Sequence, residues 1–106
     1  MVYRKMQKTK AVDAQTSRFL IAAPEYNSSI TGVLKNAIDW TSRPEPDETP
    51  LIAYSGKVAA LLATSPGGLS GLRTLVTVRM ILGNLNMIVI PEQKAIPQAH
   101  QAFDEQ

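Results

Sequence analysis

The chain has 106 residues, the size of one small domain, and it contains no cysteine and a single histidine. Hydrophobic residues make up 44% and charged residues 19%, which is typical of a globular protein and not of a disordered one. The longest apolar run, Val58–Ala63, is far shorter than the roughly 20 residues of a membrane-spanning helix. These features exclude a disulfide framework, a thiolate zinc site and a multi-histidine metal site, and we expect a reducing, cytoplasmic setting.

The net charge of +2 is concentrated near the N-terminus. Residues 1–18 carry five basic side chains and one acidic one, whereas residues 19–106 carry six basic and eight acidic ones. A basic arm occurs in proteins that bind nucleic acids or membrane surfaces, but it is also typical of a solvated, weakly helical segment. We expect residues 1–17 to form a solvated, weakly helical segment, because the rest of the chain is net acidic and lacks a helix-turn-helix signature. Neither a nucleic acid nor a membrane is an expected partner.

Three short apolar runs predict strands, at Phe19–Ala23, Val58–Ala63 and Met87–Ile90. Each is apolar at every position, as in parallel strands that are buried on both faces. The third run is predicted to end at Pro91. Residues 92–106 are predicted to form an irregular tail with a turn of helix near residues 98–103.

Two helical patterns lie between these strands. The first predicts a helix over Ile30–Trp40, capped by Asn27, Ser28 or Ser29, with Gly32 inside it at a close contact. The second predicts a helix from Leu69 to Leu82 in which Gly83 forms a left-handed C-terminal cap. Three prolines exclude regular structure from residues 42–56, and a loop of about 15 residues is often functional, although a plain connection is equally expected.

The order strand–helix–strand–helix–strand predicts a parallel sheet in an α/β fold. If the three strands are neighbours and both crossovers are right-handed, both helices cover the same face. The opposite face and the outer edge of the first strand are then uncovered. Such surfaces predict that the chain associates with itself or with a partner.

Ligands of open parallel sheets bind beyond the carboxyl ends of the strands. Two loops are predicted there, at residues 24–29 and 65–71, and each leads into a helix whose first amides are free to bind a ligand. Taken alone, the glycine-rich second loop is also typical of a tight turn, because it matches neither a Walker A sequence nor G-x-G-x-x-G. Ser65 has no histidine near it in sequence, and we find no paired acids. No catalytic side chain and no metal ligand are therefore predicted.

Several motifs in the chain resemble the NADPH-dependent FMN reductase family, which includes quinone, chromate and azo-dye reductases. The resemblance covers nearly all of residues 18–106, and residues 1–17 form a lead-in. It is carried by Pro24-Glu25-Tyr26-Asn27-Ser28-Ser29, Leu34-Lys35-Asn36-Ala37-Ile38-Asp39-Trp40, Ser65-Pro66-Gly67-Gly68 with Gly71 and Arg73, and Pro91-Glu92-Gln93.

The resemblance implies a flavin site, in which the cofactor FMN carries hydride from NADPH or NADH to a small-molecule acceptor such as a quinone or chromate. The helix Ile30–Trp40 is implied to contribute to a homo-oligomer interface. The resemblance implies two groups of residues around the flavin. Those that border the flavin ring are Pro24, Glu25, Tyr26 and Asn27. Those that close around the ring from the next strand are Ser65, Gly67 and Gly68.

Family members also have an early strand with a Gly-Ser-x-Arg phosphate loop and a final covering helix, and neither pattern is found in this sequence. We therefore expect a partial flavodoxin-like three-layer fold with about three of five strands, truncated at both ends. We expect FMN binding by this chain alone to be weak or absent. The alternative is a non-catalytic remnant of the family that acts only through its oligomer interface.

Overall fold

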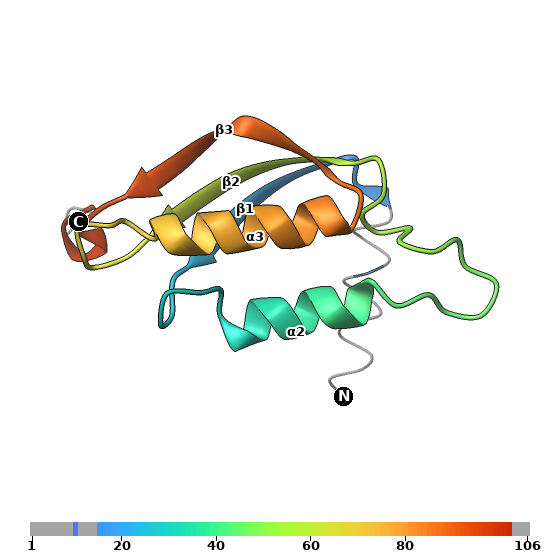
Figure 1. Ribbon diagram of the computed structural model, residues 1–106. Helices are drawn as coiled ribbons and strands as arrows, with labels where there is room; N and C mark the ends of the chain where they lie inside the picture. Colours follow the sequence, from blue (N-terminus) through green and yellow to red (C-terminus); the bar gives the residue numbers. More distant parts are fainter. Residues whose placement is uncertain (1–9, 11–14, 103–106) are drawn as a thin grey trace.

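The computed structural model describes residues 10 and 15–102. Along the chain, β1 (Arg18–Pro24), α2 (Gly32–Thr41), β2 (Val58–Thr64), α3 (Leu72–Asn84), β3 (Ile88–Ile96) and the 3₁₀ turn η1 (Ala99–Gln101) follow one another. The three strands are parallel and lie in the order β1-β2-β3 (Figure 1). The predicted α/β fold with a parallel sheet is confirmed. Most of residues 1–17, for which a weak helix was expected, lies outside the described residues.

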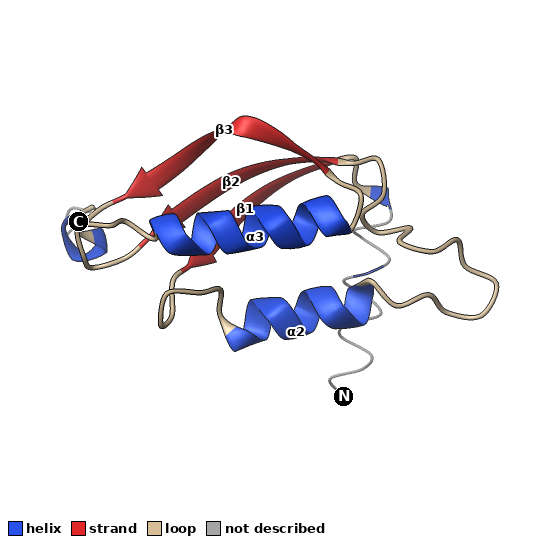
Figure 2. Ribbon diagram, in the orientation of Figure 1, coloured by secondary structure: helices blue, strands red, loops and turns tan. Residues whose placement is uncertain are grey.

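Both helices cover the same face of the sheet, as predicted (Figure 2). Alternate residues of β2, including Leu61, are buried against the inner side of α3, where Leu75 and Leu82 are fully buried. On the opposite face, the side chains of Leu20 and Ile88 are 71% and 58% exposed. The described chain thus has one sheet layer and one helix layer, and the outward face of its strands is apolar and uncovered. None of the described helices is both long and apolar enough to span a bilayer.

The N-terminus of α2 differs from the prediction. Thr31 is the cap, and its Oγ1 accepts a hydrogen bond from the amide of Leu34 at 3.1 Å. The predicted capping residues form a separate turn before the helix, because Asn27 and Ser28 have φ of 52° and 66°. Gly32 is the first helical residue, and a Cβ there would meet nothing within 4 Å, so the predicted close contact is wrong.

Helix α3 starts and ends later than predicted, because its left-handed residues lie elsewhere. Gly71, with φ of 80°, precedes the first turn, and Asn86, with φ of 64°, follows the last. The amides of Asn86 and Met87 donate to the carbonyls of Gly83 and Leu82 at 3.0 and 3.1 Å, which is a Schellman motif with asparagine in the left-handed position. Gly83 is therefore helical, and the prediction that it forms the cap is wrong.

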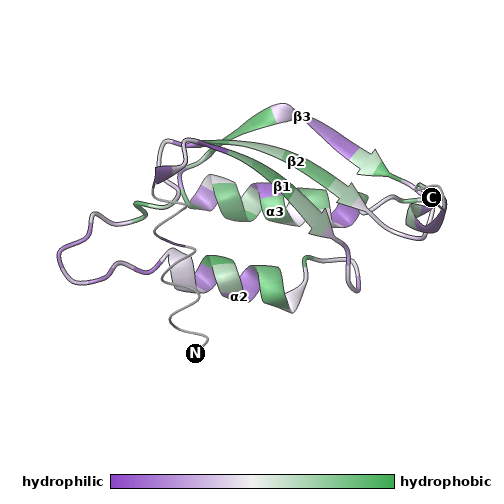
Figure 3. Cartoon of the chain, turned by 180° about the vertical axis from the view of Figure 1, so that it is seen from behind, coloured by the Kyte–Doolittle hydropathy of each residue, from purple (hydrophilic) through white to green (hydrophobic). Residues whose placement is uncertain are grey.

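Strand β3 continues through Pro91 to Ile96, although the sequence predicted that it would end at this proline. The pairing with β2 shifts between Ala59 and Leu61, so that extra residues of β3 bulge out around the proline, which has no amide to donate. Figure 3 shows the hydrophilic residues of this stretch as the purple part of β3.

Arg79 of α3 holds this bulge in place. Its guanidinium donates to the carbonyls of Val89 and Ile90 at 3.4 and 2.9 Å and to Oε1 of Gln93 at 2.9 Å. These carbonyls lie where the register shift interrupts the ladder. A side chain of the helix therefore replaces bonds that the sheet does not make.

The loop of residues 42–57 lies at the end of the sheet where the strands begin, away from the carboxyl ends (Figure 1). It is fastened from two sides. The buried Lys10 donates to the carbonyl of Arg43 and to Oε2 of Glu48, and the hydroxyls of Thr41 and Tyr54 are hydrogen-bonded to each other. These contacts give the loop a structural role, so its length alone does not indicate function.

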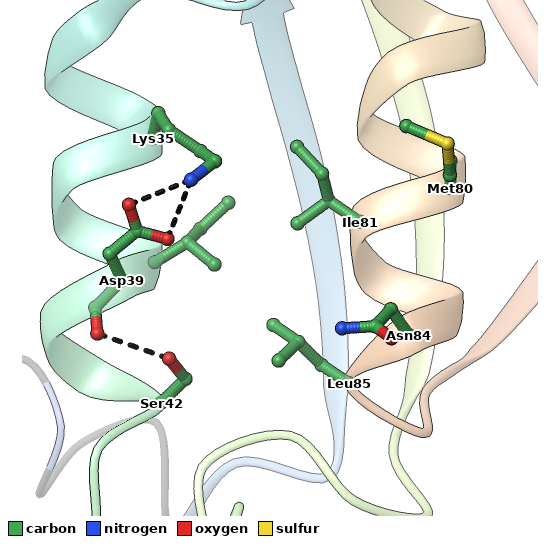
Figure 4. Close-up of a pocket in the computed structure, with 8 residues that line it drawn as sticks. Lys35, Asp39, Ser42, Met80, Ile81, Asn84 and Leu85 are labelled. Carbon is green, nitrogen blue, oxygen red and sulfur yellow. Dashed lines mark hydrogen bonds and ion pairs between the residues drawn. The ribbon is translucent and has the colours of Figure 1, made fainter.

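A pocket of about 350 Å³ lies between the C-terminal halves of α2 and α3 (Figure 4). An ion pair of 2.7 Å between Lys35 and Asp39 lies on the α2 side, and Met80, Ile81 and Leu85 lie on the α3 side. A smaller apolar pocket of about 190 Å³ lies under α2, between Leu34 and Phe19 of β1. Helix α2 therefore packs less closely on the sheet than α3 does.

We predict that Arg79→Ala lowers the free energy of unfolding by about 2 kcal/mol, because it removes charged hydrogen bonds and leaves carbonyls of the bulge unpaired. Arg79→Lys retains the charge but not the forked donors, and we expect it to recover only part of the loss. Urea unfolding measures both. The control is Lys94→Ala, at an exposed position of β3, the strand that carries the bulge. Equal stability of Arg79→Ala and the control would contradict this role.

The hydrogen bonds from Lys10 and from the Glu45 amide hold the pKa of Glu48 below its ordinary value of 4.5. A lowered folded-state pKa stabilises the fold above the unfolded-state pKa, and this contribution is lost as the pH falls through the folded value. We therefore expect wild type to be more stable than Glu48→Gln at pH 7, and the difference to shrink below about pH 4.5. Urea unfolding from pH 7 to pH 3 measures it. A difference independent of pH would contradict the assignment.

Candidate functional site

The register of β1 and β2 places the two loops of interest side by side. Pro24, the last residue of β1, is the partner of Thr64, the last residue of β2. The segments that follow, which we call the first loop (residues 25–31) and the second loop (residues 65–71), therefore leave the same edge of the sheet. This is the edge at which parallel α/β sheets bind ligands. Figure 1 shows both loops at the arrowhead end of the strands, next to the starts of α2 and α3.

The first loop is built around a tight turn, which we call the Tyr26 turn (residues 26–29). The amide of Tyr26 donates to the carbonyl of Ser29 at 3.0 Å, and the amide of Ser29 donates back at 3.1 Å. Positive φ at Asn27 and Ser28 closes the turn, and asparagine tolerates this conformation better than most residues do. The turn places the side chain of Tyr26 at the surface, where it is 64% exposed.

The second loop contains three glycines with two different roles. Gly71 is required by packing, because a Cβ there would lie 2.8 Å from Cβ of Ala63 and 3.3 Å from the amide nitrogen of Thr64. By contrast, a Cβ at Gly67 would only approach Oγ of Ser65 at 3.9 Å, and one at Gly68 would meet nothing within 4 Å. Neither of these two has positive φ. The described part of the chain thus gives no packing reason for glycine at either position.

Two hydrogen bonds join the first loop to α3. The carboxylate oxygen Oε1 of Glu25 accepts from the amide of Thr74 at 3.0 Å, and Nη1 of Arg73 donates to Oγ of Ser28 at 3.0 Å. Thr74 is the third residue of α3, so its amide has no partner within the helix. The carboxylate also lies at the positive end of the helix dipole.

A third segment reaches the same edge from the C-terminal side. The amide of Ala99 in η1 donates to the carbonyl of Ser65 at 3.0 Å, and Oγ1 of Thr64 donates to the carbonyl of Ile96 at 2.9 Å. The turn of helix predicted near residues 98–103 is present as η1 (Ala99–Gln101), but its contact with the second loop was not predicted, because residues 92–106 were otherwise expected to form an irregular tail. The prediction that β3 ends at Pro91 was wrong, because the strand continues to Ile96. The apolar pair Ala95 and Ile96 was the sequence signal for this continuation.

The structure thus brings together all seven residues that were predicted to border a cofactor: Pro24, Glu25, Tyr26, Asn27, Ser65, Gly67 and Gly68. Arg73 and Thr74 lie beside them and were not predicted as site residues. No cluster of three or more His, Cys, Asp or Glu side chains suited to a metal occurs among the described residues. The arrangement offers backbone groups, small side chains and one exposed aromatic ring, which suit binding of a flat ligand with a polar edge.

Comparison with known proteins identifies the relatives of this chain. The sequence pattern described as NADPH-dependent FMN reductase matches residues 3–101. An NAD(P)H-dependent FMN reductase of Pseudomonas aeruginosa is 41% identical over 106 residues, which span 99% of this chain and 52% of that protein. A quinone reductase of Escherichia coli K12 is 38% identical over 100 residues, which span 86% of this chain and 50% of that protein.

Among solved structures, the flavoenzyme NAD(P)H:(acceptor) oxidoreductase FerB from Paracoccus denitrificans superimposes with a TM-score of 0.74 at 29% identity. The superposition covers 85% of this chain and 48% of FerB. The chain thus spans about half the length of these relatives. The match from residue 3 to residue 101, the 41% identity and the shared flavodoxin-like fold together show that the chain belongs to the NADPH-dependent FMN reductase family.

Proposed function

We propose that the chain contributes the flavin-binding edge of an NAD(P)H-dependent FMN reductase. The observation that carries this proposal is the pairing of Pro24 with Thr64, which brings the first and second loops together at the ligand-binding edge of the sheet. FMN, when bound, supplies the hydride chemistry between NADH or NADPH and the acceptor. In this proposal, the protein's part is to bind and orient the cofactor.

The second loop fits a flat ring. Within the described residues, the amides of Gly67 and Gly68 donate to no other group, and the space beside both α-carbons is open. Two free amides with no side chain in front of them suit the polar edge of a flavin. Ser65 lies at the start of this loop, and its carbonyl is held by Ala99.

The first loop fits the other border of the ring. Pro24 ends β1, and the backbone of Glu25 and Asn27 follows at the sheet edge, while the exposed ring of Tyr26 offers a surface for stacking. The turn geometry of residues 26–29 fixes where these groups lie. In this proposal, Pro24, Glu25, Tyr26 and Asn27 act mainly through their backbone and the tyrosine ring.

The proposed acceptor is a quinone or another small oxidant such as chromate. Support comes from the relatives named quinone reductase, of which that of E. coli K12 is 38% identical to this chain. Because NAD(P)H is an intracellular metabolite, we propose the cytoplasm as the compartment.

We further propose that the chain works as a homo-oligomer. Leu72, Val76 and Met80 form an outward stripe on α3 and are 47%, 65% and 69% exposed. Val33 and Trp40 of α2 are 83% and 50% exposed. Large apolar side chains at this density on one helical layer favour burial against another copy.

The proposal predicts that the purified chain quenches FMN fluorescence weakly but saturably, and that Gly68→Val weakens this binding. Valine fills space beside the proposed ring, so we expect a loss of roughly 5- to 100-fold in affinity, the effect of overpacking by a side chain. Folding is expected to be unchanged, since nothing lies within 4 Å of the added Cβ. Fluorescence titration gives the affinity, and the thermal midpoint checks the fold.

The matched control is Gly83→Ala, another glycine with open space but on α3 near the other end of the sheet. We expect it to leave FMN affinity unchanged and to raise stability by up to about 1 kcal/mol, because alanine favours helix. No quenching by wild type at high micromolar protein would contradict the proposal and favour a non-catalytic remnant that acts through its interface.

For the oligomer, we expect light scattering after size-exclusion chromatography to give a mass above the 11.6 kDa of one chain. Val76→Glu together with Met80→Glu places charges on the α3 stripe and is expected to reduce that mass, because burial of unpaired charge is costly. A wild-type monomer with a cooperative melt would contradict this proposal.

A further inference from the structure

We propose that Glu25 is a positioning residue, whose carboxylate fastens the Tyr26 turn to the N-terminus of α3. This inference rests on the proposed function, because it concerns how the flavin-facing backbone of the first loop is held. It assigns the side chain of Glu25 to the protein's own helix, and only its backbone to the cofactor.

The first argument is that α3 has no cap of its own. Its N-cap residue is Gly71, which has no side chain to accept a hydrogen bond. Glycine is required there, because a Cβ would lie 2.8 Å from that of Ala63. An Asp, Ser or Thr, the usual capping residues, is therefore excluded at this position by packing. The helix must take its acceptor from another segment.

Glu25 supplies that acceptor. Its Oε1 accepts from the amide of Thr74 at 3.0 Å, which is the bond that an N-cap side chain would make to the third helical residue. The negative charge also lies at the end of α3 where the helix dipole is positive. Because the capping residue lies 49 positions earlier in the chain, this hydrogen bond links the first loop to the start of α3.

Glu25 is well placed to fix the Tyr26 turn, because Glu25 is the residue immediately before this turn. On the other side of the turn centre, Ser28 accepts a hydrogen bond from Arg73 at 3.0 Å. The turn is thus tied to the first turn of α3 at two points, three residues apart. With both ties in place, Tyr26 and the neighbouring amides keep a fixed position relative to the second loop, which leads into the same helix.

Amide hydrogen exchange of the cofactor-free chain tests the tie directly. In Glu25→Ala we expect the exchange of the Thr74, Tyr26 and Ser29 amides to rise roughly 3- to 30-fold, the change that loss of one helix cap produces. Glu25→Gln retains an acceptor oxygen and is expected to preserve most of the protection. Glu92→Ala, at an exposed position of β3, is the control and is expected to change none of the three.

The FMN affinity of the same variants gives the second readout, by fluorescence titration. We expect it to follow the exchange rates, with Glu25→Ala weakened and Glu25→Gln close to wild type. Faster exchange at Thr74 alone, with Tyr26 and Ser29 unchanged, would overturn the proposal, because Glu25 would then cap the helix without fixing the turn. Weaker FMN binding with unchanged exchange would also overturn it, since Glu25 would then contact the cofactor itself.

The two proposals fail in different ways. If wild type binds no FMN, the proposed function fails for this chain, and the exchange rates alone decide whether Glu25 ties the turn to α3. If Glu25→Ala loosens the turn and FMN affinity stays at the wild-type value, the tie exists but does not serve the cofactor, and the proposal is wrong.

Discussion

The pairing of Pro24 with Thr64 is the constraint on which the rest of the structure depends. Because β1 and β2 are parallel and end in register, the chain leaves both strands at the same edge. Because the strand order is β1-β2-β3, two right-handed crossovers place both helices on one face of the sheet. A shift of β2 by one residue would turn Leu61 and Ala63 away from the helices. The side chains on the other face of β2 would then point toward α3. The hydrophobic core therefore fixes the register, and the register fixes the position of the two loops.

Close packing at Gly71 connects that core to the site. The backbone of Gly71 rests on Ala63 and Thr64, so α3 begins directly above the last residues of β2. This approach leaves no room for a side chain that caps the helix, and the carboxylate of Glu25 takes that role. A feature of the core thus determines which polar contacts the loops make, and the loops in turn hold the groups that face a ligand.

Much of this arrangement could be predicted from the sequence, and the parts that could not have physical reasons. Uniform apolar runs and a spacing of three and four residues identify β1, β2 and the two helices, since those patterns reflect burial alone. The motif around Tyr26 identifies the site because it resembles a family. The bulge at Pro91 was missed, because Arg79 compensates for it from another element. The capping of α3 by Glu25 was missed because it joins residues 49 positions apart, and local patterns carry no trace of such a contact.

The order β1-β2-β3 also bears on how the chain reaches this structure. Among the described strands, β2 pairs with β1 and β3 pairs with β2, so during synthesis β2 and β3 each emerge from the ribosome with a neighbour already available. Neither β2 nor β3 has to be inserted between two strands that are already paired. The crossover helix formed in between reaches the nascent sheet on the face it will cover, and the three described strands assemble in one direction, from β1 to β3.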